Sequence, residues 1–158
     1  PSCLHRHRGF ESHSLRQFLK MKNKFAKYFT EAPPFLKIFG LLDLYYDDEN
    51  EFFVCEYKPN EDLTHSNGTI VQGGFITGML DSTMAQFLIF KSKATMSPLT
   101  LNINVKFLLP CRPSMVKVIA SIEREGKSII FTNAKMFQNK ELIATASSIN
   151  KLIPNTNN

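Results

Sequence analysis

The sequence has few cysteines and no long apolar run, and each shortage narrows the class of protein. Its three cysteines, Cys3, Cys55 and Cys111, are odd in number, far apart and without the paired spacing of a metal site. A disulfide framework or a zinc ribbon is therefore not expected, and a reducing compartment fits best. The longest apolar stretch, FLIF at 87–90, is far shorter than the roughly eighteen residues of a membrane-spanning helix. We expect no membrane span.

Acidic residues are scarce near the N-terminus. In the first 28 residues, seven lysines and arginines accompany a single acid, Glu11. This basic arm lacks the apolar core of a secretory signal, but its arginine-, histidine- and serine-rich composition is also that of a transit peptide. We expect a cytoplasmic protein and leave organellar import open. The formal net charge of +5 suits nucleic acid, an anionic membrane surface or a polyanionic small molecule without choosing among them.

Length and composition indicate one globular domain. The 158 residues are 43% hydrophobic and 21% charged, as in ordinary soluble domains, and no segment repeats. We place a basic arm with an amphipathic helix at 1–40, the main domain at 41–154 and a polar tail at 155–158.

The spacing of apolar residues predicts an α+β fold. An amphipathic helix is expected at 15–29, and a short helical turn follows Pro33-Pro34 and is closed by Gly40. The segment between Gly74 and Lys91 is apolar nearly all round and too long for a strand, which predicts a buried helix. Strand-like runs occur at 41–46, 51–57, 99–109, 115–124, 127–138 and 141–152. We expect a hairpin from the first two, an antiparallel meander from the last four, and a curled antiparallel sheet wrapped around the helix.

Asp81 is the one formally charged side chain between Asp62 and Lys91, and it lies in the middle of the predicted buried helix. Burying a lone carboxylate costs on the order of several kcal/mol unless it is hydrogen-bonded or neutralised. The ordinary interpretation is a structural aspartate satisfied by backbone groups or by Ser82 and Thr83. The residues before the helix favour a functional carboxylate instead.

Gln72, Gly73 and Gly74 stand directly before the predicted helix. Glycines let the backbone approach a ligand, and a helix N-terminus presents unpaired N–H groups to a developing negative charge. The segment is a candidate oxyanion hole, although a Gly-Gly pair is more often a plain turn. Asp81 lies eight residues beyond Gly73, about 12 Å along a helix. One chain cannot place both on one carbonyl, so their cooperation requires a dimer.

The segment HSNGTIVQGGFITGMLDSTMA at 65–85 resembles the signature of hot-dog-fold thioesterases of the phenylacetate-degradation and thioesterase superfamily member 2 type. The likeness extends less specifically from about Leu41 to Leu152 and leaves out the first forty residues. It implies a hot-dog fold and an acyl-CoA thioesterase of lipid metabolism.

The resemblance also implies the catalytic residues. Asp81 matches the acid that acts as general base or nucleophile, and Gly73 matches the glycine whose N–H polarises the thioester carbonyl. Thr100 falls where the family has a Ser or Thr that positions the attacking water. Ser66 stands at the offset of the family's asparagine, and with a one-residue loop deletion Asn67 takes that place.

Substrate-binding residues follow from the same resemblance. Gln72 replaces the family's usual histidine and keeps a hydrogen-bonding side chain, and Gly74 follows the oxyanion glycine. The phosphates and adenine of CoA are expected along a strand turn, at Arg124, Gly126, Lys127 and Ser128, with Phe107 and Lys151 nearby. Cations there suit a polyanionic leaving group, whereas a solvated rim is the ordinary interpretation of each alone.

The favoured function is hydrolysis of an acyl-CoA thioester by a homodimer or a dimer of dimers, with no cofactor because CoA is part of the substrate. Hot-dog dehydratases are disfavoured because the central helix has no histidine, while a non-catalytic acyl-CoA-binding module is the main alternative. His65 is more often a bystander, and His5, His7 and His13 lack partners at ligand spacing, so no metal is expected. The basic segment at 15–29 could also be a membrane or nucleic-acid contact. Because it lacks aromatic interleaving and a binding motif, we expect a packed helix with a solvated lysine face and no nucleic-acid partner.

Overall fold

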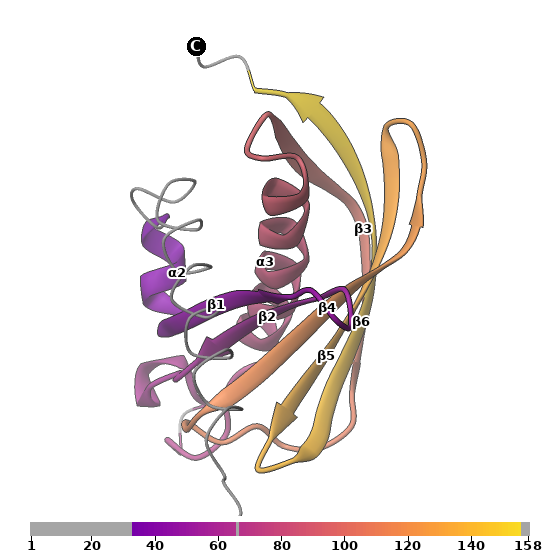
Figure 1. Ribbon diagram of the computed structural model, residues 1–158. Helices are drawn as coiled ribbons and strands as arrows, with labels where there is room; N and C mark the ends of the chain where they lie inside the picture. Colours follow the sequence, from indigo (N-terminus) through magenta and orange to yellow (C-terminus); the bar gives the residue numbers. More distant parts are fainter. Residues whose placement is uncertain (1–32, 66, 156–158) are drawn as a thin grey trace, which may run out of the picture.

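The computed structural model describes residues 33–65 and 67–155, in which a curled antiparallel sheet surrounds one long helix (Figure 1). The elements are α2 (Pro34–Ile38), β1 (Leu41–Asp47), β2 (Phe52–Tyr57), the 3-10 turn η1 (Glu61–Leu63), α3 (Gly73–Lys91), β3 (Met96–Phe107), β4 (Val116–Glu125), β5 (Ile129–Gln138) and β6 (Glu141–Pro154). The expected α+β hot-dog fold is confirmed. The amphipathic helix expected at 15–29, and with it most of the basic arm, lies outside the described residues.

The sheet has six strands in the order β1-β2-β4-β5-β6-β3, with every pair antiparallel. The meander expected from the last four strands is wrong in one respect, because β3 pairs with β6 at the edge and β4 pairs with β2. The reason lies in the connection 108–115, which contains Pro110 and Pro113 instead of a tight hairpin turn. This connection is tied to the loop before α3 by the hydrogen bond from Val71 N–H to the Cys111 carbonyl, 2.9 Å.

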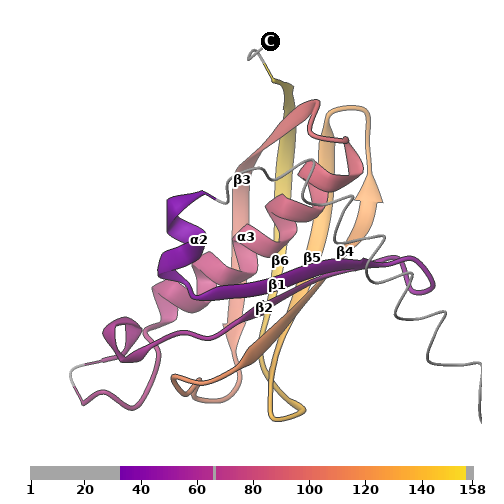
Figure 2. The same ribbon diagram turned by 60° about the vertical axis from the view of Figure 1, so that its left-hand side comes forward.

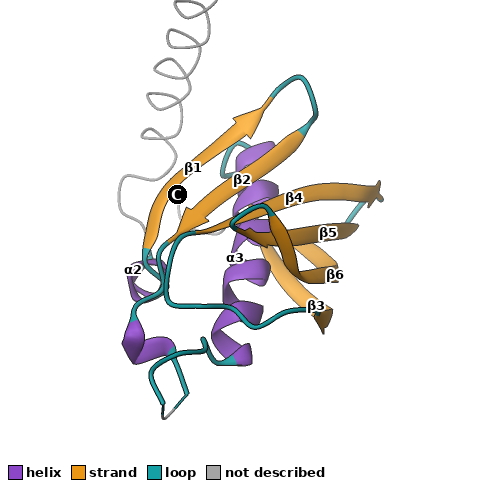
Figure 3. Cartoon of the chain, turned by 90° about the horizontal axis from the view of Figure 1, so that it is seen from below, coloured by secondary structure: helices purple, strands orange, loops and turns teal. Residues whose placement is uncertain are grey.

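The helix α3 is buried because its sequence offers no polar face. Met79, Leu80, Met84 and Phe87 are at most 1% exposed and face the strands, which contribute Phe53, Cys55, Tyr57, Val118 and Met136 to the same core. Burying each large apolar side chain stabilises the fold by about 1.5–3 kcal/mol. Figures 2 and 3 show how the sheet reaches around the helix: β1 and β2 cross one side of α3 while β3 to β6 stand along another. Among the described residues, no helix is long and apolar enough to cross a membrane.

A bulge in β3 decides which of its side chains face α3. Thr100 pairs with Asn150 and Asn102 pairs with Ile149, so Leu101 is an extra residue on β3. One inserted residue shifts the alternation of side chains between the two faces of the sheet. Thr100 and Ile103 therefore both face the helix, although their positions differ by three and a regular strand would place them on opposite faces. The bulge is what lets a polar side chain and the apolar end of β3 share one face.

Gly40 joins α2 to β1 in a conformation that only glycine adopts easily. Its φ is +74°, and its carbonyl accepts a hydrogen bond from Lys58 N–H at 2.8 Å. A Cβ at this position would overlap the Lys58 carbonyl oxygen. Gly68 has a similar φ of +69° but no heavy atom within 4 Å of the place where a Cβ would stand. The two glycines thus differ in packing but share their backbone conformation.

We expect Gly40→Ala to destabilise the protein much more than Gly68→Ala. Alanine at positive φ costs about 1 kcal/mol, which both variants incur. The overlap with Lys58 adds to this at Gly40 alone, for a total loss of roughly 3 kcal/mol in the free energy of unfolding. Urea denaturation of the two variants measures both losses. Equal losses would show that the contact with Lys58 does not constrain this junction.

Candidate active site

Asp81 is the ninth residue of α3 and lies where the helix contacts β3. The Thr100 hydroxyl donates a hydrogen bond to Asp81 Oδ1 at 2.8 Å. Burial raises the pKa of the Asp81 carboxyl above its usual range, and the hydrogen bond from Thr100 acts in the opposite direction. A carboxyl with a raised pKa is better matched to proton transfer near neutral pH than an ordinary aspartate.

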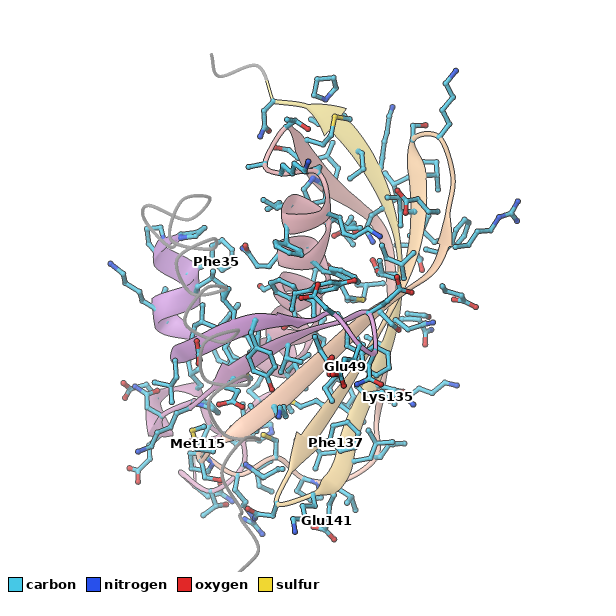
Figure 4. All side chains as sticks on the ribbon, viewed as in Figure 1. Phe35, Glu49, Met115, Lys135, Phe137 and Glu141 are labelled. Atoms are coloured by element: carbon cyan, nitrogen blue, oxygen red, sulfur yellow. The ribbon has the colours of Figure 1, made fainter. Side chains whose placement is uncertain are left out.

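Asp81 lines an apolar hollow that lies between α3, α2 and the start of β3. The hollow has a volume of about 440 Å³ and is lined mainly by apolar side chains, among them Phe35, Phe39, Ile89 and Pro98. Phe35 stands on α2, on the side of α3 opposite β5 and β6 (Figure 4). A hollow of this kind suits an acyl chain better than a charged group.

The first turn of α3 leaves one backbone donor available. Gln72 is the N-cap residue, and its side-chain Oε1 accepts a hydrogen bond from Gly74 N–H at 2.6 Å. The N–H groups of Phe75 and Ile76 both donate to the Gln72 carbonyl. Among the described residues, the Gly73 N–H has no acceptor. The Gly74 N–H, expected among the substrate contacts, is thus occupied by the side chain of Gln72.

A second hollow of about 350 Å³ lies beside Gly73. Phe107 lines it, and its ring lies 3.2 Å from the position that a Cβ of Gly73 would take. His65 also lines this hollow, so a residue that the sequence marked as a bystander is a neighbour of the candidate oxyanion donor. Gly73 therefore lies at a hollow that has an aromatic wall.

The two hollows share no lining residue. Gly73 lines one and Asp81 lines the other, which agrees with their separation of eight residues along α3. A single chain therefore does not bring the carboxylate and the free N–H to one point. The structure brings Thr100 to Asp81 and Phe107 to Gly73, and it keeps these two pairs apart.

Asn67 lies away from both hollows. Its Oδ1 accepts hydrogen bonds from Thr69 N–H at 3.3 Å and from the Thr69 hydroxyl at 3.0 Å. It is exposed and lines neither the hollow of Gly73 nor that of Asp81. Within one chain its side chain stabilises its own loop.

The residues expected to bind CoA fall into two places. Gly126, Lys127 and Ser128 form an exposed turn between β4 and β5, and Arg124 is exposed near the end of β4. Lys151 lies beside this turn, because Leu152 N–H donates to the Ser128 carbonyl at 2.9 Å. Phe107 is remote from this turn. On β3, Leu99 pairs with Lys151 and Phe107 pairs with Ala144. Lys151 and Ala144 are seven residues apart on β6, about 23 Å at about 3.3 Å per residue.

Several polar residues near Asp81 were not found from the sequence. Asn150, Thr132 and Ser148 form a buried row behind Thr100, with Asn150 fully buried. Period-two alternation in β6 could have indicated that Ser148 and Asn150 share the inward face with Ala144 and Ala146. Gln86 also lines the hollow of Asp81, and its Oε1 is buried without a partner among the described residues.

The chemistry of this arrangement is acid–base chemistry. A carboxyl with a raised pKa, a hydroxyl bound to it and a free N–H at a helix N-terminus are the parts needed to activate water and to stabilise an oxyanion. Among the described residues, no cluster of three or more His, Cys, Asp or Glu side chains could hold a metal ion.

Known proteins share this fold and part of this sequence. Residues 68–144 match the thioesterase superfamily. A phenylacetic acid degradation-related protein from Ralstonia eutropha JMP134 is 25% identical, with 81% of this chain and 98% of that chain covered and a TM-score of 0.71. No curated protein sequence matches the chain.

Two further structures are less similar in sequence and show the fold alone. A mutant of a thioesterase from Staphylococcus aureus subsp. aureus Mu50 is 17% identical, with 77% of this chain and 100% of that chain covered and a TM-score of 0.69. A mutant of the phenylacetic acid degradation protein PaaI from Thermus thermophilus is 18% identical, with 75% and 98% covered and a TM-score of 0.65. The family match includes Gly73, Asp81 and Thr100, so this part of the chain is similar to the thioesterase superfamily, and the whole domain has the hot-dog fold.

Proposed function

We propose that the protein hydrolyses an acyl-CoA thioester, with Asp81 as its catalytic carboxylate. The observation that carries this proposal is the Asp81 carboxyl, held by Thr100 at the mouth of an apolar hollow. Its raised pKa suits a general base, and the hollow suits the acyl chain. The match of residues 68–144 to the thioesterase superfamily supports the reaction class.

In the proposed reaction, Asp81 takes a proton from water as the water oxygen bonds to the thioester carbonyl carbon. The carbonyl oxygen becomes an oxyanion that accepts a hydrogen bond from Gly73 N–H. The C–S bond then breaks, and the departing CoA thiolate takes the proton from Asp81. Thioester and water yield a carboxylic acid and a thiol, so no cofactor is consumed. Direct attack by the carboxylate is the other route by which the same residue would serve.

The proposed active site is completed by a second copy of the chain. β3 is an edge strand of twelve residues, and it and the segment after it expose Leu99, Leu101, Phe107, Leu108 and Leu109, each at least 44% exposed. A long apolar edge strand is a template for pairing with another chain. A two-fold axis midway between Thr100 and Phe107 would place Phe107 and Gly73 opposite the Thr100 and Asp81 of its partner.

The same two-fold axis would also bring together the residues expected to bind CoA, which lie in two distant places of one chain. It would bring Phe107 of one copy to the end of the sheet that carries Lys151 and the turn with Arg124 and Lys127 of the other. Guanidinium and ammonium groups there would bind the phosphates of CoA. A hollow on the outer face of the sheet, lined by Met115 and Phe137 (Figure 4), would be left for the contacts of a dimer of dimers.

The alternative is a non-catalytic module that binds acyl-CoA. It is favoured by Asn67, whose side chain is occupied by its own loop, and by the replacement of a histidine by Gln72. The free thiols of Cys55 and Cys111 fit the reducing cytoplasm that we propose as the compartment of either activity.

We expect Asp81→Asn and Asp81→Ala to abolish thiol release from a panel of short-chain, long-chain and aryl acyl-CoAs. Loss of a general base lowers kcat by about 10²–10⁴-fold. Glu141→Gln, at an exposed carboxylate at the start of β6 (Figure 4), is the matched control and should retain full activity. Thiol release is followed with a thiol reagent. CoA esters that bind without turnover would favour the binding module.

The variant Gly73→Pro tests whether the Gly73 N–H is the oxyanion donor. Gly73 is the first helical residue, and Gln72 has φ −68° and ψ 138°, a conformation that a residue before proline prefers. Gly73→Pro should therefore keep α3 and lower kcat by about 10²–10³-fold through loss of the N–H. Gly73→Ala introduces the same contact with Phe107 but keeps the N–H, so it should remain far more active. Equal kcat values in both variants would exclude the N–H as the oxyanion donor.

Mixing two inactive variants tests the shared site. Subunit exchange between Asp81→Asn and Gly73→Pro forms mixed dimers in which one of the two sites has both Asp81 and Gly73. Random pairing should restore about a quarter of the activity of the natural protein. Activity measured after co-refolding, with each variant alone as the control, gives the result. No recovery in mixtures shown to contain mixed dimers would place both groups in one chain.

A further inference from the structure

Behind the Asp81–Thr100 pair lies a row of buried polar side chains. Asn150 and Thr132 are fully buried and Ser148 is 3% exposed, and all three stand on the face of the sheet that packs against α3. Buried polar groups cost stability unless they are hydrogen-bonded, so such a row on an apolar face needs a reason. At one end of the row Asn150 contacts the Thr100 hydroxyl, which donates a hydrogen bond to the Asp81 carboxylate.

The orientation of the Asn150 amide follows from its partners. Its Nδ2 donates to Thr132 Oγ1 at 3.1 Å and to Ser148 Oγ at 3.0 Å. The Thr132 hydroxyl donates a hydrogen bond to the sulfur of Met84, 3.2 Å away. An oxygen lone pair of Thr132 is therefore left to accept from the Asn150 amide. Both amide protons of Asn150 are therefore used on this side, and Oδ1 faces Thr100 at 3.2 Å.

Thr100 consequently has two acceptors for one proton. Its Oγ1 lies 2.8 Å from Asp81 Oδ1 and 3.2 Å from Asn150 Oδ1. A hydroxyl donates once but can accept through two lone pairs. When the proton points to Asp81, it stabilises the carboxylate. When it points to Asn150, a lone pair of Oγ1 faces Asp81 and can accept a hydrogen bond from the neutral acid.

We propose that Asn150 is a positioning residue that competes with Asp81 for the hydroxyl proton of Thr100, so that this hydroxyl serves both protonation states of Asp81. This role rests on the proposed function, in which Asp81 takes a proton from water and later gives it to the CoA thiolate. In the first state Thr100 donates to the carboxylate. After water has lost its proton to Asp81, Thr100 turns to Asn150 and accepts from the carboxylic acid until the thiolate leaves. No bond other than hydrogen bonds changes within the row.

The charged surroundings of Asp81 are simple enough for its titration to report this competition. Among the described residues that line its hollow, from α2, α3 and β3, Asp81 is the one ionisable group. The row on β5 and β6 consists of neutral Thr132, Ser148 and Asn150. Lys151 follows Asn150 on β6, so its side chain stands on the opposite face of the sheet.

The test is a titration of Asp81 by carboxyl ¹³C NMR, with the signal assigned by its loss in Asp81→Asn. Asn150→Leu removes the competing acceptor, so the Thr100 proton is left to the carboxylate and the pKa of Asp81 should fall. Asn150→Asp has nearly the shape of asparagine but can add a second negative charge, so the pKa should rise. Two substitutions that shift the titration in opposite directions cannot be explained by loosened packing. Ser147→Ala, on the outer face of the same strand, is the matched control and should change nothing.

A double-variant cycle tests whether Asn150 acts through Thr100. Thr100→Val should raise the pKa of Asp81, and adding Asn150→Leu to it should have no further effect. In turnover, Asn150→Leu should lower kcat about tenfold, the equivalent of one hydrogen bond, with KM little changed. An unshifted titration in Asn150→Leu, or the same shift with and without the Thr100 hydroxyl, would overturn the proposal. The NMR titration needs no turnover, so it is separate from the failure of the proposed function, which full activity of Asp81→Asn would reveal.

Discussion

A helix that is apolar on nearly every side has to be covered on nearly every side, and this constraint on α3 shapes the molecule. A flat sheet covers one face of a helix, so the six strands curl, and the β1–β2 hairpin turns across the side that β3 to β6 leave open. Asp81 is tolerated at the seam between α3 and the edge strand, where Thr100 supplies a hydrogen bond and the hollow admits water. A carboxylate deeper among Met79, Met84 and Phe87 would lack both.

The rigidity of the same helix separates the two chemical groups. Gly73 owes its free N–H to its place at the first turn, and Asp81 owes its raised pKa to its place in the middle, so neither can move toward the other without losing its property. β3 runs along both places, with Phe107 beside Gly73 and Thr100 beside Asp81. Because β3 is also an edge strand, pairing two copies along it would bring complementary ends together. The outer edge of β3, which has no partner strand among the described residues, is thus the edge that could complete the site.

Local patterns in the sequence were sufficient for the elements and for the lone carboxylate. The buried helix, the β1–β2 hairpin, the turn at Gly40 and the isolation of Asp81 each depend on neighbouring residues alone. The position of β3 beside β6 could not be predicted, because strand order depends on pairing between distant segments and the 108–115 connection carries no hairpin signal. The bulge at Leu101 was hidden for the same reason, since a bulge exists only in relation to a partner strand. Thr100 was expected from a family resemblance, and its bond to Asp81 needed the structure.

Gln72, which stands where the family resemblance implies a histidine, has a physical role that the sequence alone could not reveal. The Gln72 side chain caps α3 by accepting from Gly74 N–H, and the backbone carbonyl of Gln72 accepts from the N–H groups of Phe75 and Ile76. All but one of the donors at this helix N-terminus are thereby used, and the positive end of the helix dipole acts on a ligand through Gly73 alone. An amide does not titrate near neutral pH, whereas an imidazole does. The cap that leaves the Gly73 donor free is therefore independent of pH, so a change in protonation at Asp81 would leave this donor in place.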